Sequence, residues 1–376
     1  MEVKAVLLSI PFGFVFLFSG LIINLIQGAC YILVQPLSKT AHRRIIGAVT
    51  EILWLEFIFL MDWWSGFKVH LHTDFETYQL MGKEHALLMP NHICDADIFI
   101  MWLLAQRSSC LRGALMVVKR SSMYIPIYGW ATWFAEHVFV SRNWGKDEEV
   151  LKSRFQSLQD FPRPFWLTLF VEGTRMTSDK LVAAQNFATS KGLPVPRNVL
   201  IPRTKGFVAA VRHMRSFVPA IYDITLAVPR GLRTPSLLGF LGREPTAVQI
   251  HIKRYSMKEL PESDEAVAQW CRDKFVAKDN MLDEFQAKGT FENQKNTDIG
   301  RPRKSLIVLT TLGCIICLVV ISLIQRYSLL STRKGVISLA AGLALDAVFL
   351  HAVIEYTKLP QARKASMGNL TVQLKN

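Results

Sequence analysis

The residues with the most useful chemical spacing are a histidine followed by two aspartates. His92 precedes Asp95 and Asp97 in the segment Pro90–Asp97. An imidazole that donates one ring N–H to a carboxylate offers its other nitrogen as a general base. Carboxylates are also stabilised at a helix start, where both aspartates are expected. The spacing therefore favours a histidine base held by Asp97 or Asp95. The alternative is that the aspartate only caps the helix and that His92 is an ordinary loop residue.

A glycine-containing turn forms the second chemical group. The apolar pair Phe170–Val171 leads directly into Glu172, Gly173, Thr174 and Arg175. Glycine lets the backbone approach a ligand closely, and the planar guanidinium of arginine can bind a phosphate with two parallel hydrogen bonds. The turn indicates an anion site, although a tight turn with a surface ion pair has the same composition.

Two further cations and a proline stand at the ends of apolar segments. Lys119 and Arg142 each follow a short apolar segment, and Pro202 follows another. Taken singly, each cation is typical of a solvated charge, and the proline marks a strand end or an apolar wall. Their common position at strand ends is the informative property.

The elements that must position these residues lie between about residues 76 and 300. Short segments rich in β-formers alternate there with amphipathic segments, which predicts an α/β domain. One segment alternates polar and apolar residues, which predicts an edge strand. We expect strands at Ala86–Met89, Ala114–Val118, His137–Val140, Phe165–Val171, Asn198–Ile201, Pro219–Leu226 and Ala247–Lys253 (the edge strand), and helices at Asp95–Gln106, Asp147–Leu158, Ser178–Lys191 and Glu265–Leu282.

The strand ends predict where a ligand binds. In open α/β sheets, ligands bind outside the carboxyl ends of the strands. Four of the predicted strands end next to a histidine, a carboxylate or a cation, so four loops are expected to meet in one cleft. The cleft then combines a base with several positive charges.

The composition points to an anionic partner. The 376 residues are 50% hydrophobic and only 20% charged, and the formal net charge is +14. The apolar content argues against a disordered or purely cytosolic protein, and the charge fits nucleic acid, an anionic membrane or phosphorylated small molecules. Because the cations lie beside apolar termini and at strand ends, nucleic acid is the weakest of these. The six cysteines show neither a disulfide framework nor a metal-binding spacing.

The N-terminal segment has the length of a membrane helix. No charged residue occurs from Ala5 to Ser38, which exceeds the roughly 20 residues that a membrane-spanning helix needs. The apolar run is too long for a cleaved signal peptide, so we expect a retained membrane helix. The segment Ile52–Phe67 carries carboxylates and ends in a Trp pair, which favours a helix in the interface or a hairpin with the first helix, with a core helix as the alternative.

Two apolar segments lie near the C-terminus. Ser305–Gln325 is uncharged and long enough to span a membrane, and Gly335–Ile354 is a weaker candidate because it contains Asp346 and His351. A short linker joins them, so we expect a transmembrane hairpin. The chain is thus divided into membrane-anchoring helices at 1–75, a catalytic domain at 76–300, and a hairpin with a tail at 301–376.

The order of the motifs resembles that of the membrane glycerolipid acyltransferases. That family has an Asn-His-x4-Asp block, a Phe-x-x-Arg block, a Phe-x-Glu-Gly-Thr-Arg block and an apolar-Pro block. The chain is most similar to the plant endoplasmic-reticulum type of 1-acylglycerol-3-phosphate acyltransferase, over almost its whole length. The four blocks are matched here by Asn91–Asp97, Phe139–Arg142, Phe170–Arg175 and Val199–Pro202.

The resemblance implies a fold, a reaction and a role for each residue. The fold is a mixed sheet wrapped by helices. His92 is the general base for the sn-2 hydroxyl of lysophosphatidic acid, Asp97 holds its tautomer, and the acyl donor is acyl-CoA. No metal or bound cofactor is implied. The remaining roles are phosphate binding by Arg175 with Lys119 and Arg142, orientation of those cations by Glu172 in the turn with Gly173 and Thr174, and an acyl groove at Pro202.

The resemblance also implies a location and leaves alternatives open. It implies a multi-pass protein of the endoplasmic reticulum membrane whose catalytic domain faces the cytosol. Ile93 and Cys94 stand where the family usually has a basic residue and serine, and Ser141 stands where it usually has an acidic residue. These departures bear on the choice of acyl chain or acceptor. The alternatives are an enzyme for glycerol-3-phosphate or a lysophospholipid, and a catalytically degenerate membrane scaffold.

Overall fold

The central sheet holds the predicted site in place. The computed structural model describes residues 2–291, 296–297 and 299–357. In these residues the strands form one mixed sheet in the order β4-β3-β5-β2-β6-β7-β1-β8. Their bounds are β1 Lys68–His72, β2 Ala86–Pro90, β3 Ala114–Lys119, β4 Val138–Val140, β5 Trp166–Thr168, β6 Ala220–Ala227, β7 Ala247–Ser256 and β8 Asn296–Thr297.

The pairing directions bring four carboxyl ends together. β4, β3, β5, β2 and β6 are parallel to one another, whereas β7 is antiparallel to β6. The loops after β2, β3, β4 and β5 therefore leave the same edge of the sheet, as the strand-end pattern predicts. The mixed α/β architecture is confirmed.

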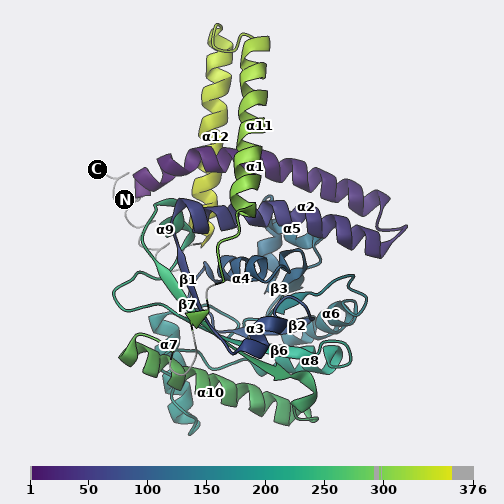
Figure 1. Ribbon diagram of the computed structural model, residues 1–376, viewed down its shortest axis with the longest axis vertical. Helices are drawn as coiled ribbons and strands as arrows, with labels where there is room; N and C mark the ends of the chain where they lie inside the picture. The colour runs from purple at the N-terminus through teal and green to yellow at the C-terminus, as the bar shows by residue number, and fades with distance from the viewer. Residues whose placement is uncertain (1, 292–295, 298, 358–376) are drawn as a thin grey trace.

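Helices cover both faces of the sheet (Figure 1). Along β2, Ala86 and Leu88 face one core and Leu87 and Met89 face the other, because successive strand side chains point to opposite sides. The first core includes α1, α2 and α4, and the second includes α6, α8 and α10. The helices are α1 Glu2–Leu33, α2 Lys39–Phe59, α3 Phe75–Leu80, α4 Asp97–Arg107, α5 Tyr128–Phe134, α6 Trp144–Gln156, α7 Ser178–Ser190, α8 Thr204–Met214, α9 Leu237–Leu241, α10 Asp264–Lys288, α11 Lys304–Arg326 and α12 Arg333–Thr357.

One predicted strand is absent, and one predicted strand has the wrong position in the sheet. Residues 198–201 are not a strand, because the backbone N–H groups of Asn198 and Leu200 donate to the side chains of Asp279 and Glu172 instead of to a neighbouring strand. The strand at 247–253 is not at an edge, since β7 lies between β6 and β1. Its polar residue His251 is buried against Phe291 rather than exposed, so the alternation does not mark a solvent-facing side.

The sheet also begins earlier in the chain than expected. β1 lies before the boundary that we predicted at residue 76, yet it pairs with β7 inside the sheet. The segment 52–67 includes the end of α2 and a π-helical turn, Leu60–Trp64. Its carboxylates are bonded within the protein: Glu56 accepts a hydrogen bond from Ser19 at 2.6 Å and Asp62 pairs with Arg107 at 2.5 Å. These contacts fix the segment against the domain and against α1.

The terminal helices form two hairpins that run crosswise to each other. In Figure 1, α1 and α2 lie side by side over the sheet, and α11 and α12 project away from the domain. Lys304 at the start of α11 pairs with Glu51 of α2 at 2.6 Å, which ties the two hairpins together. In the described residues, Ile10–Leu33 and Lys304–Arg326 are long and apolar enough to cross a membrane. Residues 358–376 of the predicted tail lie outside the described residues.

Candidate active site

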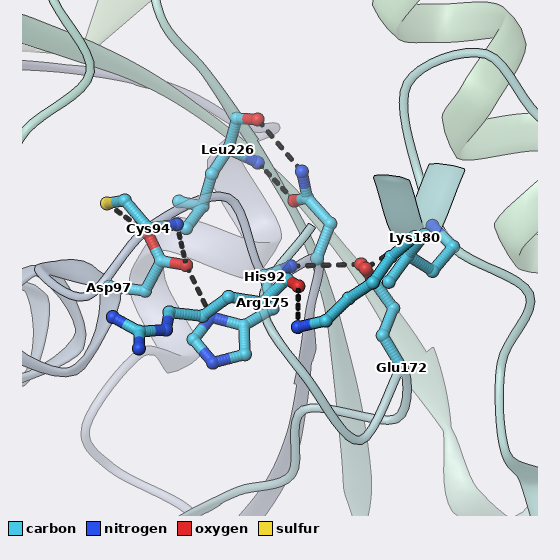
Figure 2. A network of polar contacts seen from close by, with 9 residues as sticks. His92, Cys94, Asp97, Glu172, Arg175, Lys180 and Leu226 are labelled. Carbon is cyan, nitrogen blue, oxygen red and sulfur yellow. Dashed lines mark hydrogen bonds and ion pairs between the residues drawn. The ribbon is translucent and has the colours of Figure 1, made fainter. Parts of the chain in front are cut away.

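His92 and Asp97 meet at the end of β2. The side chain of Asn91 exchanges two hydrogen bonds with the backbone of Leu226 on β6, at 3.0 and 2.7 Å, which fixes the start of the loop. Asp97 begins α4, and its carboxylate lies 2.7 Å from the Nδ1 atom of His92 (Figure 2). With Nδ1 held in this way, Nε2 is the nitrogen that a substrate can use. The partner of His92 is thus Asp97, and Asp95 instead lines the neighbouring cavity.

The surroundings hold this pair rigidly. Asp97 is fully buried, and its Oδ2 atom also accepts the backbone N–H of Cys94 at 2.9 Å. The thiol of Cys94 donates to the Oδ1 atom of Asp97 at 3.0 Å. On the other side, the ring of Phe170 stacks on the imidazole with centroids 4.2 Å apart. The geometry is that of an oriented general base.

The thiol contact predicts a change in the rate of acyl transfer. A hydroxyl is a stronger hydrogen-bond donor than a thiol, so Cys94→Ser keeps the bond to Asp97 and Cys94→Ala removes it. A hydrogen bond of this kind contributes about 0.5–1.5 kcal/mol, so we expect Cys94→Ala to lower kcat by roughly 2- to 10-fold and Cys94→Ser to keep at least the wild-type kcat. Initial rates at saturating substrate measure this, and equal kcat values for all three proteins would contradict the contact.

Glu172 has a different role from the one that we predicted. We expected it to orient the cationic side chains. Its carboxylate is instead 2% exposed and accepts the backbone N–H groups of His92 at 2.9 Å and Leu200 at 3.3 Å. The backbone turns towards the buried carboxylate because an unpaired buried N–H is costly. Glu172 therefore joins the loop after β5 to the loops that carry His92 and Pro202.

Burial of Glu172 predicts a pH-dependent stability. Burial raises its pKa from 4.5 to about 8, against the opposing hydrogen bonds. Because the folded-state value lies above the unfolded one, the contribution to stability is full below pH 4.5 and is lost as the pH rises towards 8. We expect the melting temperature of the wild type to fall relative to that of Glu172→Gln over this range. Each kcal/mol of unfolding free energy that is lost lowers the melting temperature by roughly 2–4 °C. Thermal unfolding in detergent at several pH values tests this, and parallel curves would refute it.

The predicted cations surround one cavity of about 730 Å³ beside His92. Lys119, Arg142 and Arg175 line it from the ends of β3, β4 and β5, and Gly173 and Pro202 also line it. Gly173 has a φ of +71°, which lies in the left-handed region that residues other than glycine rarely adopt. Figure 2 shows the side chain of Arg175 extending alongside the imidazole. The structure thus brings together most of the predicted site residues.

Thr174 does not line the cavity but supports it. Its Oγ1 atom accepts a hydrogen bond from Lys180 at 2.6 Å. The same amine donates to the backbone carbonyl of Arg175 at 3.0 Å, as Figure 2 shows. Burial and then the charges of Arg175, Arg142 and Arg203 lower the pKa of Lys180. These four cations consequently lie close enough to repel one another, which favours the binding of a multiply charged anion.

The cavity also has an extensive apolar wall. Asp95 and Arg175 lie at its polar end, where burial raises the pKa of Asp95 to about 6 despite the charge of Arg175. The apolar side is formed by α1, α2, α4, α9 and the start of α5 with the segment before it, through Phe16, Phe57, Ile98, Phe99, Ile125, Pro126, Tyr128 and Leu237. One space thus combines cationic side chains, a histidine held by a carboxylate and an apolar wall.

Comparisons with known proteins agree with this combination. The Acyltransferase family matches residues 67–228, and the Acyltransferase C-terminus family matches residues 239–312. The chain is 50% identical to 1-acyl-sn-glycerol-3-phosphate acyltransferase 2 of Arabidopsis thaliana, over 97% of this chain and 94% of that protein. It belongs to the 1-acyl-sn-glycerol-3-phosphate acyltransferase family. Human 1-acyl-sn-glycerol-3-phosphate acyltransferase gamma is 35% identical over 77% of each chain.

A solved structure is also similar. The 1-acyl-sn-glycerophosphate acyltransferase of Thermotoga maritima aligns with 77% of this chain and 99% of its own, with a TM-score of 0.47 and 16% identity.

Three residues of this acyltransferase site were not among our candidates. Arg203 and Lys205 line the cavity directly after Pro202, and Trp144 lines it from the start of α6. Two cations immediately after the predicted strand end at Pro202 are the signal that could have identified the first two. Trp144 carries no such signal, because an aromatic residue at a helix start is typical of a core position.

Proposed function

We propose that this acyltransferase moves the acyl group of acyl-CoA to the sn-2 hydroxyl of 1-acyl-sn-glycerol-3-phosphate, which gives phosphatidic acid. The observation that carries the proposal is the position of His92. Its imidazole is held by Asp97 at 2.7 Å. It lines the cavity that also contains Arg175 and the apolar wall. A lysophosphatidic acid has the matching order of groups, with a phosphate, a hydroxyl and a hydrocarbon chain.

The proposed reaction is a direct transfer with general-base catalysis. The Nε2 atom of His92 takes the proton of the sn-2 hydroxyl while the oxygen forms its bond to the thioester carbonyl carbon. Asp97 stabilises the imidazolium that results. Collapse of the tetrahedral intermediate breaks the C–S bond, and the proton on His92 passes to the departing sulfur. The products are phosphatidic acid and free CoA, without a covalent enzyme intermediate, a metal or a bound cofactor.

The charged and the apolar walls of the cavity contact different parts of the acceptor. Arg175 beside His92 binds the phosphate, with Arg142 and Lys119 as supporting charges. Pro202 and its apolar neighbours shape the space for an acyl chain. The lipid is proposed to enter on the α1–α2 side of the cavity, because both helices contribute apolar side chains to it, Phe16 from α1 and Phe57 from α2.

The two crossed hairpins support a proposal for the placement of the chain in the membrane. We propose that α11 and α12 cross the membrane of the endoplasmic reticulum and that the catalytic domain faces the cytosol. α1 runs crosswise to that hairpin, so it then lies along the membrane surface rather than across it (Figure 1). Exposed apolar residues on α1 and on α11, such as Leu25 at 74% and Leu318 at 68%, suit contact with lipid.

Product analysis tests the proposed function. Membranes that contain the expressed chain are supplied with oleoyl-CoA and 1-acyl-sn-glycerol-3-phosphate, and the lipids are separated and quantified. We expect phosphatidic acid to form, with much slower acylation of glycerol-3-phosphate and of lysophosphatidylcholine. Faster acylation of either alternative acceptor would replace the proposed substrate, and no acylation of any acceptor would favour a scaffold role.

A further inference from the structure

The cavity extends from one face of the sheet to the other. Phe16 and Phe57 pack in the core on the α1–α2 face, whereas Trp144 packs against the core on the α6–α8 face, and all three line the same cavity. Because α1 and α2 form the side that we assign to the membrane, the α6–α8 end is the side open to water. A lipid acceptor and a water-soluble thioester can therefore enter from different ends.

The α6–α8 end combines an aromatic ring with positive charge. Trp144 is the first residue of α6, and Lys205 lies in the first turn of α8, two helices that pack against each other. The ammonium of Lys205 lies 5.6 Å from the centroid of the Trp144 ring. Arg203 precedes α8, and its side chain passes close to Gly173 in the loop after β5. Aromatic rings with adjacent cations are suited to a purine base that carries phosphates.

These charges exceed what the acceptor phosphate needs. Arg203 and Lys205 are exposed, and within the described part of the chain neither pairs with a carboxylate. The acceptor carries one phosphate, which Arg175 and its neighbours at the polar end accommodate. CoA carries a diphosphate, a 3′-phosphate and an adenine, so it has both the charge and the ring that this end of the cavity matches.

We infer that Trp144, Arg203 and Lys205 bind the nucleotide part of the acyl donor. This inference rests on the proposed use of acyl-CoA. The indole of Trp144 stacks on the adenine, and the two cations bind the phosphates. The pantetheine arm then passes along the cavity to the thioester at His92. The α6–α8 face thus binds the donor, whereas Arg175 and the α1–α2 face bind the acceptor.

Binding of CoA itself to the full chain in detergent tests the inference by calorimetry. Removing one exposed phosphate-binding cation costs roughly 1 kcal/mol, so we expect Lys205→Gln to weaken CoA binding about 5-fold. Lys146→Gln is the matched control, because Lys146 is an exposed cation on α6 that does not line the cavity. We expect this control to bind CoA like the wild type. Equal weakening in both variants would overturn the inference, since it would indicate a general charge effect.

The aromatic contribution is tested by two substitutions at one position. Trp144→Phe keeps a ring for stacking and Trp144→Leu does not, so we expect CoA binding to follow the order wild type, Phe, Leu, with about a 10-fold range. Folding of both variants is checked by thermal unfolding. If Phe and Leu variants that are equally well folded bind CoA as the wild type does, Trp144 has no part in donor binding.

Steady-state kinetics separate the two substrates. We expect Lys205→Gln to raise the KM for oleoyl-CoA about 5-fold and the KM for lysophosphatidic acid less than about 2-fold. A larger effect on lysophosphatidic acid would assign this end of the cavity to the acceptor. Binding of CoA by a wild-type chain that transfers no acyl group would reject the proposed function, yet it would leave the nucleotide site supported. Acyl transfer by the wild type with an unchanged KM for the donor in the variants would support the proposed function and reject the nucleotide site.

Discussion

His92→Ala is expected to lower kcat by about 1,000-fold while the KM values of both substrates change little. General-base catalysis contributes about 10²–10⁴-fold to an enzymatic rate, and the imidazole that we propose as the base is held by Asp97 at 2.7 Å and has Phe170 against its ring. The loss is in kcat because the base acts on the hydroxyl only as the bond to the thioester carbon forms. Radiolabelled acyl transfer to lysophosphatidic acid in isolated membranes measures it.

Two comparisons keep this prediction interpretable. Lys146→Gln, which changes an exposed residue outside the cavity, is expected to retain wild-type kcat. Expression of the His92→Ala chain in an acyltransferase-deficient strain is expected not to restore growth. If His92→Ala restored growth as well as the wild type, the general-base mechanism would be excluded and a scaffold role would become the better explanation.

Arg175→Ala is expected to raise the KM for lysophosphatidic acid by roughly 30- to 100-fold and the KM for acyl-CoA far less. A hydrogen bond between charged groups contributes about 1.5–3 kcal/mol, and a guanidinium can make two of them to one phosphate. Arg175 lines the cavity next to His92 and is half-buried, so water replaces it poorly. Initial rates over a grid of both substrate concentrations give the two KM values.

The matched control for Arg175 is Arg120→Ala, because Arg120 is an exposed arginine at another strand end that does not line the cavity. We expect that variant to keep both KM values. Arg175→Lys retains the charge but not the planar fork, so it should recover only part of the affinity. An equal rise in both KM values for Arg175→Ala would count against a specific role in binding the acceptor phosphate.

Local patterns were sufficient to predict most elements. A buried strand such as β2 is a continuous apolar segment, and helices such as α7 and α10 follow capping residues, so their positions depend on nearby residues. The strand predicted at 198–201 failed because its backbone donors bond to distant acceptors, Asp279 and Glu172. The edge position predicted for β7 failed because β1, which pairs with it, comes from a part of the chain that we had assigned to the membrane anchor.

By itself, the sequence determined which chemical groups are available and that they stand at strand ends. Those properties depend on residue type and on short-range spacing, and they were enough to place His92, Arg175 and Arg142 around one cleft. Spacing alone left Asp95 and Asp97 open as the partner of His92, and only the tertiary structure shows the Asp97 carboxylate at the imidazole and Glu172 bonded to backbone rather than to the cations. It also showed that the cavity joins the α1–α2 face to the α6–α8 face. Each of these depends on which side chains are buried together, and burial is set by packing between segments far apart in the chain.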